Sequence, residues 1–327
     1  MMRSRLYKLE RLRHSAIVKG DRLESFNIEG EIARMSASSP QLRSHESQAF
    51  GYVQQAYIPK DLIREISYLN EDALPRREIE PMIEDCRAFV SDKLRVDISG
   101  VQIVRVNLDL ALCEAQAASC GDTEHLVLLP LAATGFQAPD ILVHELGHTA
   151  EFTLRRSIGE DRFLAQHSFL SETVAHYCQY RYLKEFGTPQ ERLGAMGSIV
   201  KEYLGLKAVL ASYDLERRDE DRLLIHEICA HEYVSDFVEI YGRNVVGSIL
   251  KGYDQLSIGY IYQYFVEPRF GAILAMHLID QPQKVRDLAM SEANKPIAAT
   301  LREMNLDAEL LLDFSRLGDI MWNFVDS

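Results

Sequence analysis

The stretch from residue 138 to residue 148 constrains the fold of this chain more than any other. Pro139 and Asp140 suit the first turn of a helix, where a proline needs no amide hydrogen and an acid meets the positive end of the helix dipole. Apolar residues then recur at helical spacing, and His144 and His148 stand four positions apart. A helix places both imidazoles on one face, so the sequence predicts a buried helix with a polar face.

The pattern His144-Glu145-Leu146-Gly147-His148 indicates a metal site. Two imidazoles at this spacing can reach one zinc ion, and Glu145 lies close enough to accept a proton from water at the metal. A catalytic zinc ion needs a third protein ligand and an open position for water. The downstream candidates are Glu151, His167, Glu172 and His176.

We choose Glu172 as the third ligand. It lies 24 residues after His148, within a second predicted helix, Ser168–Phe186, that can return to the first. Glu151 is expected to orient a ligand or to face solvent. His176 follows Glu172 by one turn on the same face, and it suits either a hydrogen-bond donor behind the ligands or a core histidine.

The rest of the chain predicts an α+β fold with helix in excess. Pro75 and Pro81 mark a boundary between a helical N-terminal segment, 1–74, and a second domain, 75–327. Pro130 suggests that the third of the predicted strands is at an edge of the sheet. The strands are predicted at Val101–Val106, Ala111–Ala118 and His125–Leu131, and the earlier helices at Leu6–Val18, Leu62–Leu69 and Ile79–Leu94.

Composition narrows the classes of partner. The chain has 327 residues and a formal net charge of −13, which argues against binding to nucleic acid or to an anionic membrane surface. Its five cysteines are odd in number and form no CxxC pair, so we expect reduced thiols. The charged N-terminus has no apolar signal region. We therefore expect a soluble, cytoplasmic protein.

The HExxH stretch followed by a glutamate-bearing helix resembles the gluzincin metallopeptidases, and more particularly the thimet oligopeptidase/oligopeptidase F family. The tyrosine-rich stretch Gly259–Tyr264 and the strand His125–Leu131 extend the resemblance over residues 100–280. The resemblance implies a zincin-like catalytic domain. It also implies that Tyr260 or Tyr264 holds the scissile carbonyl and that the strand aligns the substrate along a sheet edge.

The tyrosines also fit a structural role. Tyr253, Tyr260 and Tyr264 form one stripe if residues 253–267 are a continuous helix, and such a stripe suits a core as well as a site. Tyr262 is expected to point elsewhere. A second histidine pair, His226 and His231, is five positions apart and diverges around a helix, so we interpret that segment as helix packing with a buried Cys229.

The chain also departs from the family. Ala175 and Gln179 stand where the family has serine and glutamate after the ligand, and Lys251–Tyr253 has no histidine. The chain is also shorter than usual family members. These departures motivate the alternative of a catalytically silent zincin fold that binds a peptide or protein, and a toxin-like protease with one protein target is a third alternative.

We expect zinc-dependent hydrolysis of peptides or unfolded polypeptides, of oligopeptidase or endopeptidase type. His144, His148 and Glu172 would hold Zn²⁺, Glu145 would be the general base, and Tyr260 or Tyr264 would stabilise the oxyanion. Oligomeric state, the physiological metal and the substrate's sequence stay open.

Overall fold

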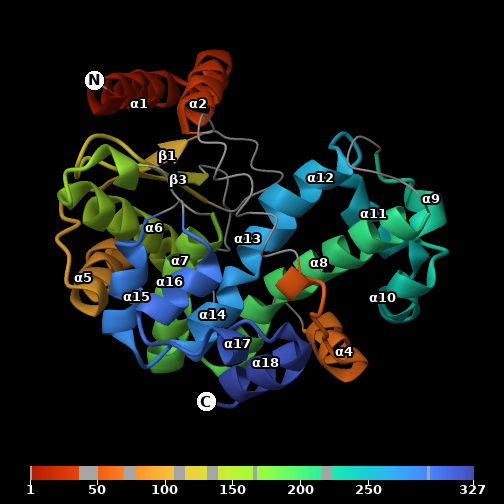
Figure 1. Cartoon of the computed structure of the whole chain (residues 1–327). Coiled ribbons are helices and arrows are strands. Elements are labelled where there is room, and N and C mark those ends of the chain that lie inside the picture. Colours follow the sequence, from red (N-terminus) through yellow and green to blue (C-terminus); the bar gives the residue numbers. More distant parts are fainter. Residues whose placement is uncertain are drawn as a thin grey trace.

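The computed structural model describes residues 2–36, 51–69, 79–106, 115–130, 139–164, 168–215, 222–292 and 295–327. In these ranges the chain is predominantly helical and has one small sheet, so the α+β prediction is confirmed (Figure 1). The strands are β1 (Gln102–Val106), β2 (Gln116–Ala118) and β3 (Leu126–Pro130). The helices of the first half are α1 (Met2–Lys19), α2 (Arg22–Ser36), α4 (Lys60–Tyr68), α5 (Ile83–Leu94), α6 (Pro139–Ser157) and α7 (Ser168–Phe186).

The second half of the described chain is entirely helical apart from turns and one isolated bridge. Its helices are α8 (Pro189–Asp214), α9 (Ile225–Ile228), α10 (Ser235–Tyr241), α11 (Arg243–Lys251), α12 (Ile258–Ile261), α13 (Glu267–Arg269), α14 (Gly271–His277), α15 (Pro282–Ala289), α16 (Ile297–Glu303), α17 (Ala308–Leu311) and α18 (Leu317–Val325). Short 3₁₀ turns are η2 (Glu80–Met82), η3 (Asp161–Phe163), η4 (Glu232–Val234) and η6 (Phe314–Arg316), and η5 (Tyr262–Val266) is a π-helical turn.

The sheet has the strand order β1-β3-β2, so β3 lies in the centre. β3 is parallel to β1 and antiparallel to β2. The prediction that this third strand is an edge is therefore wrong. Its side chains alternate between two apolar clusters: Val127 and Leu129 join the main core, and Leu126 and Leu128 pack on the other face. Burial on both faces explains the continuous apolar run. Pro130 ends the strand, where a missing amide hydrogen interrupts no further pairing.

The described helices of the N-terminal segment pack against two different parts of the molecule. α1 and α2 pack on each other through a small cluster of their own, which includes Leu9, Ala16 and Ile28, and they lie beside the sheet (Figure 1). α4 instead contributes Leu62 and Ile63 to the main core. The predicted boundary near residue 74 lies outside the described residues, and so does the first half, 111–114, of the predicted strand 111–118, whose second half contains β2.

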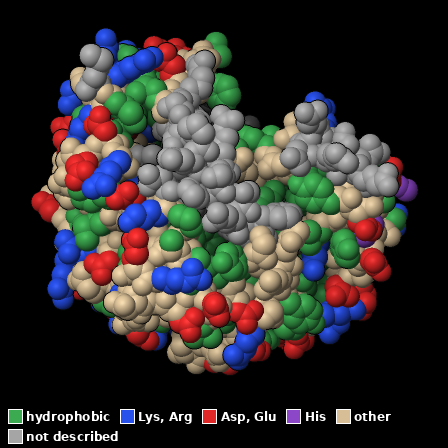
Figure 2. All heavy atoms as spheres, in the orientation of Figure 1, with side chains coloured by type: hydrophobic (Ala, Val, Ile, Leu, Met, Phe, Trp, Pro, Cys, Tyr) green, Lys and Arg blue, Asp and Glu red, His purple; other side chains and the backbone are tan. Residues whose placement is uncertain are grey.

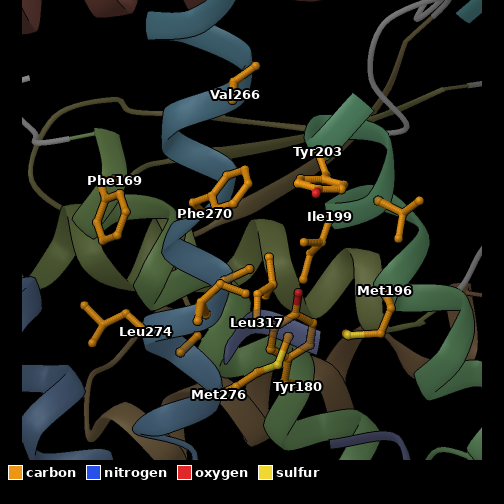
Figure 3. Packing of buried hydrophobic residues seen from close by; sticks show 14 of the residues in the cluster. Phe169, Tyr180, Met196, Ile199, Tyr203, Val266, Phe270, Leu274, Met276 and Leu317 are labelled. Carbon is orange, nitrogen blue, oxygen red and sulfur yellow. The ribbon is translucent and has the colours of Figure 1, made fainter. Parts of the chain in front are cut away.

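α7 is the central helix of the main core. α6 covers one side of it and α14 another, and glycine permits both approaches. A Cβ atom at Gly147 of α6 would lie 2.8 Å from Ala175 Cα, and one at Gly271 of α14 would lie 2.4 Å from the Phe169 carbonyl oxygen. Figure 3 shows apolar side chains from α7, α8 and α14 that meet in this core, among them Tyr180, Ile199 and Leu274.

The predicted helix that starts at Pro139 is confirmed and ends at Ser157, and the predicted helix Ser168–Phe186 is confirmed, whereas 253–267 is not one continuous helix. Helix resumes only at Ile258, after turns and a bridge between Arg222 and Ser257, and the π-helical turn η5 then shifts its phase. Tyr253 therefore lies off the helix that carries Tyr260, and the three-tyrosine stripe does not form as a single helical face.

The surface carries charges of both signs. On the face seen in Figure 2, Asp and Glu are interspersed with Lys and Arg, and the outline is hollowed between the end that holds α1 and α2 and the end that holds α9 to α12. Among the described helices, none has the length and apolar character needed to cross a bilayer.

Candidate metal centre

Two packed helices bring the predicted ligands together. α6 carries both histidines and the glutamate of the HExxH stretch, and α7 carries Glu172. Gly147, one residue before His148, lies where α6 crosses α7. Because it has no side chain, the backbones of the two helices approach closely there. Residues four positions apart share a helix face, so His144 and His148 lie on one face of α6, and Glu172 and His176 lie on one face of α7. These two faces meet where the helices cross.

The Glu172 carboxylate is central to the cluster. Its Oε2 lies 3.6 Å from His144 Nε2 and 3.5 Å from His176 Nε2, and its Oε1 lies 3.7 Å from His148 Nε2. Zinc bonds of about 2.0–2.1 Å in tetrahedral geometry place donor atoms about 3.4 Å apart. In the part of the chain that the structure describes, the potential ligand atoms of His144, Glu172 and His176 all lie within 4.8 Å of one another. The predicted ligand His148 is not in this group, although its Nε2 lies 3.7 Å from Glu172.

A hydrogen-bond relay fixes the His148 ring. The Ser171 hydroxyl donates to Glu151 Oε2 at 2.5 Å, and its oxygen lies 3.1 Å from His148 Nδ1. The proton of His148 therefore belongs on Nδ1, and the Nε2 lone pair is left for the Glu172 side of the site. Glu151 is buried, lies 3.8 Å from Arg155 and contacts His148 through Ser171.

A second relay holds His176. Its Nδ1 lies 3.0 Å from Gln179 Oε1, and the Gln179 amide donates to Asp140 Oδ2 at 2.8 Å. Nε2 of His176 and Nδ1 of His144 are buried without a hydrogen-bond partner among the described residues. Burial lowers the pKa of His176 to about 4. The imidazole is therefore neutral near pH 7, which is the form that binds a metal.

Arg269 is a site residue that the sequence analysis missed. Its Nη1 lies 3.4 Å from Glu172 Oε2, and its side chain is 36% exposed. Burial acts to raise the pKa of Glu172, but the charges of Arg269 and the nearby histidines outweigh it and hold that pKa below its usual value. Arg269 is 97 residues from Glu172 in sequence, and no local motif marks it.

Glu145 follows His144 on α6, and its carboxyl group is affected by the charge of Glu172. Its side chain is buried, at 8% exposure. Burial, reinforced by the charge of Glu172, raises the pKa of Glu145 to about 7, and a hydrogen bond with the backbone of Ala117 in β2 opposes that rise. A carboxylate with such a pKa exchanges protons readily near neutral pH.

The donor set fits a divalent ion of the zinc class. Neutral imidazoles with one carboxylate are the ligands that such ions prefer, and both His148 and His176 have the supporting hydrogen bond at Nδ1 that metal-binding histidines usually show. The buried, unpartnered Nε2 of His176 faces the same carboxylate. The residues present therefore fit the predicted metal.

The two tyrosines assigned to the oxyanion are surface residues. Tyr260 is 44% and Tyr264 55% exposed, and their rings pack on each other with centroids 4.4 Å apart. Tyr260 also contacts Phe265, whereas Tyr262 is buried, as its different orientation predicts. An oxyanion role for Tyr260 or Tyr264 stays a prediction.

The structure describes all but one of the other histidines and the cysteine that the sequence analysis considered. His167 lies outside the described residues. His231 caps η4 and its Nε2 lies 3.0 Å from Asp214 Oδ2, while His226 is exposed on the short helix α9, so this segment is a surface turn more than a packed helix. Cys229 is buried, as predicted, and it is a free thiol like the other described cysteines.

Comparison of the chain with protein-family models, curated proteins and solved structures finds no match.

Proposed function

We propose that this protein is a zinc-dependent peptidase of gluzincin type with a zincin-like domain. The observation that carries the proposal is the meeting of the HExxH face of α6 with Glu172 of α7, at 3.6 Å from His144 and 3.7 Å from His148. These residues would hold the ion, and a bound zinc ion would supply a Lewis acid that activates water. A cytoplasmic setting is part of the proposal and is supported by the free thiols.

Glu145 supplies the proton chemistry. Its carboxylate would accept a proton from the attacking water and deliver it to the leaving amine, because its raised pKa suits both steps. The peptide would lie along β2, an edge strand of the described sheet whose Ala117 backbone contacts Glu145. β3 cannot have this role, since both of its edges are paired. Tyr260 or Tyr264 would reach the scissile carbonyl.

The experiment combines metal analysis with cleavage of a quenched-peptide library. Purified protein should hold about one zinc per chain. Glu145→Gln keeps the size of the side chain but removes the proton acceptor, so zinc should stay while hydrolysis falls by about 10²-fold or more. The exposed Glu124→Gln is the control and should keep both. Wild-type protein that is fully loaded with zinc and cleaves nothing in the library would refute the peptidase proposal.

One observation favours the alternative of a silent, peptide-binding protein. Arg269 already offers Glu172 a positive partner at 3.4 Å, so the carboxylate has a cation without any metal. In that case the chain would hold less than one tenth of an equivalent of zinc after dialysis against micromolar zinc, and peptides would bind without being cleaved. One equivalent of bound zinc per chain would exclude a peptide-binding protein that holds no metal.

A further inference from the structure

His176 stands outside the ligand set of the proposed function, yet its geometry is that of a ligand. It lies one helical turn after Glu172, and its Nε2 is 3.5 Å from Glu172 Oε2, which is slightly closer than His144 Nε2 at 3.6 Å. The His144 and His176 rings are 4.5 Å apart between centroids. His176 Nε2 thus lies as near to the carboxylate as the nitrogens of the predicted histidine ligands, at 3.5 Å against 3.6 Å and 3.7 Å.

The His176 ring is held so that one nitrogen faces the site. Gln179 Oε1 lies 3.0 Å from His176 Nδ1 and accepts a hydrogen bond from it. The Gln179 side-chain amide is itself oriented, because its nitrogen donates to Asp140. Tyr180 stacks on the ring, with centroids 5.2 Å apart. Nδ1 therefore carries the proton, and Nε2 keeps a lone pair that has no hydrogen-bond donor among the described residues, although the side chain is only 2% exposed.

We infer that His176 Nε2 is a fourth protein ligand of the same ion, so that the centre has three imidazoles and one carboxylate. A residue that only orients a ligand would contact that ligand through a hydrogen bond, and His176 Nε2 makes none among the described residues. That nitrogen instead faces the Glu172 carboxylate at 3.5 Å, beside the ring of His144. A nitrogen-rich set selects borderline ions such as Zn²⁺, Co²⁺ or Cu²⁺ over Mg²⁺ and Ca²⁺. This inference rests on the metal site of the proposed function, but not on peptide hydrolysis.

Copper loading and zinc titration test the inference directly. One equivalent of Cu²⁺ is added to the apoprotein, and the coordinated imidazole nitrogens are counted by electron paramagnetic resonance. We expect three in the wild type and two in His176→Ala. In competition with a chromophoric chelator, His176→Ala should bind Zn²⁺ more than about 100-fold more weakly, because second-sphere changes cost only about 10–100-fold.

The controls separate a ligand from a structural residue. His277→Ala removes another histidine whose Nε2 is buried without a hydrogen-bond partner among the described residues, and it should keep three coordinated nitrogens and the wild-type zinc affinity. Gln179→Leu should keep three nitrogens and lose about tenfold in affinity, because the ring loses its orienting acceptor. If His176→Ala fails to fold, the wild-type count decides alone.

Failure of this inference differs from failure of the proposed function. Two nitrogens in the wild type, with stoichiometric zinc and hydrolysis that depends on Glu145, would overturn the role of His176 and leave the peptidase proposal intact. A wild-type protein that binds neither Cu²⁺ nor Zn²⁺ would overturn both. Three nitrogens without any peptide cleavage would support the four-ligand centre and refute the peptidase.

Discussion

Glu202 is a buried carboxyl group on α8, at 7% exposure, and Tyr253 donates a hydrogen bond to it at 3.4 Å. Burial raises the pKa of Glu202 from 4.5 to about 7. Between these two values the folded state keeps a proton that the unfolded state has lost, so stability falls as the pH rises through this window. The difference corresponds to about 3 kcal/mol above pH 7.

Glu202→Gln should therefore stabilise the protein at alkaline pH. An amide stays neutral and still accepts the hydrogen bond from Tyr253. Urea unfolding between pH 5.5 and 8.5 should show the variant gaining on the wild type up to about pH 7, by at most about 3 kcal/mol, and then a constant difference. The exposed Glu124→Gln should show no such trend. A variant less stable than the wild type at pH 8.5 would contradict this account.

At the same scale, local spacing explains which site residues the sequence could reveal. His144, Glu145 and His148 follow from one helical turn, and Glu172 from the return of the next helix. The hydrogen-bond relays depend on tertiary contacts: Ser171 meets His148 only because α6 and α7 cross at this point. Arg269 comes from a separate helix, so no spacing rule could connect it to Glu172.

At the scale of elements, the crossing of α6 and α7 sets the distances between the ligands. A methyl group at Gly147 would lie 2.8 Å from Ala175 Cα and 3.3 Å from the Cys178 side chain. Backbone atoms cannot yield at that distance, so Gly147→Ala must push the helices apart. We expect a loss of about 1–3 kcal/mol in the free energy of unfolding, and zinc affinity at least about tenfold weaker because donor atoms on the two helices separate.

Gly197→Ala on α8 provides the matched control. Its added methyl group would meet only Ile66 Cγ2, at 3.8 Å, which is ordinary packing. In a helix interior alanine is favoured over glycine by about 0.5–1 kcal/mol, so this variant should be slightly more stable and should keep its zinc affinity. Equal behaviour of the two variants in urea unfolding and zinc titration would mean that the crossing tolerates a wider spacing.

Helices and strands were largely predictable where the apolar residues follow a single helical or strand spacing. α6 follows from apolar spacing and a proline at its first turn, and α7 from the spacing of its apolar residues. Pro130 is compatible with the central position of β3 because it is the last residue of that strand. Burial of both faces of β3 depends on distant segments that the strand's own residues do not reveal. The π-helical turn at Tyr262–Val266 likewise has no signal in the spacing of the tyrosines.

At the scale of the whole molecule, a buried ion pair ties the N-terminal helix to the HExxH helix. Glu10 of α1 is 1% exposed and binds Arg156, near the end of α6, at 2.5 Å and 2.8 Å. The Ser119 hydroxyl and the Gly121 amide also donate to its carboxylate. This contact joins residues 146 positions apart, and for that reason the sequence analysis, which treated 1–74 as a separate helical segment, did not foresee it.

Glu10→Ala should therefore loosen α1 and α2 more than the rest of the protein. The substitution leaves the Arg156 guanidinium buried without its carboxylate, which typically costs about 3–5 kcal/mol. Hydrogen exchange should accelerate in peptides from residues 2–36 and from the turn around Gly121, while zinc affinity stays near the wild-type value because the ligands lie two turns or more from Arg156. Glu31→Ala is the matched control, since Glu31 and Arg5 form an exposed pair at 3.9 Å that contributes about 1 kcal/mol at most. Equal exchange rates in the two variants would show that apolar contacts hold α1 in place, and that the ion pair adds little to the attachment.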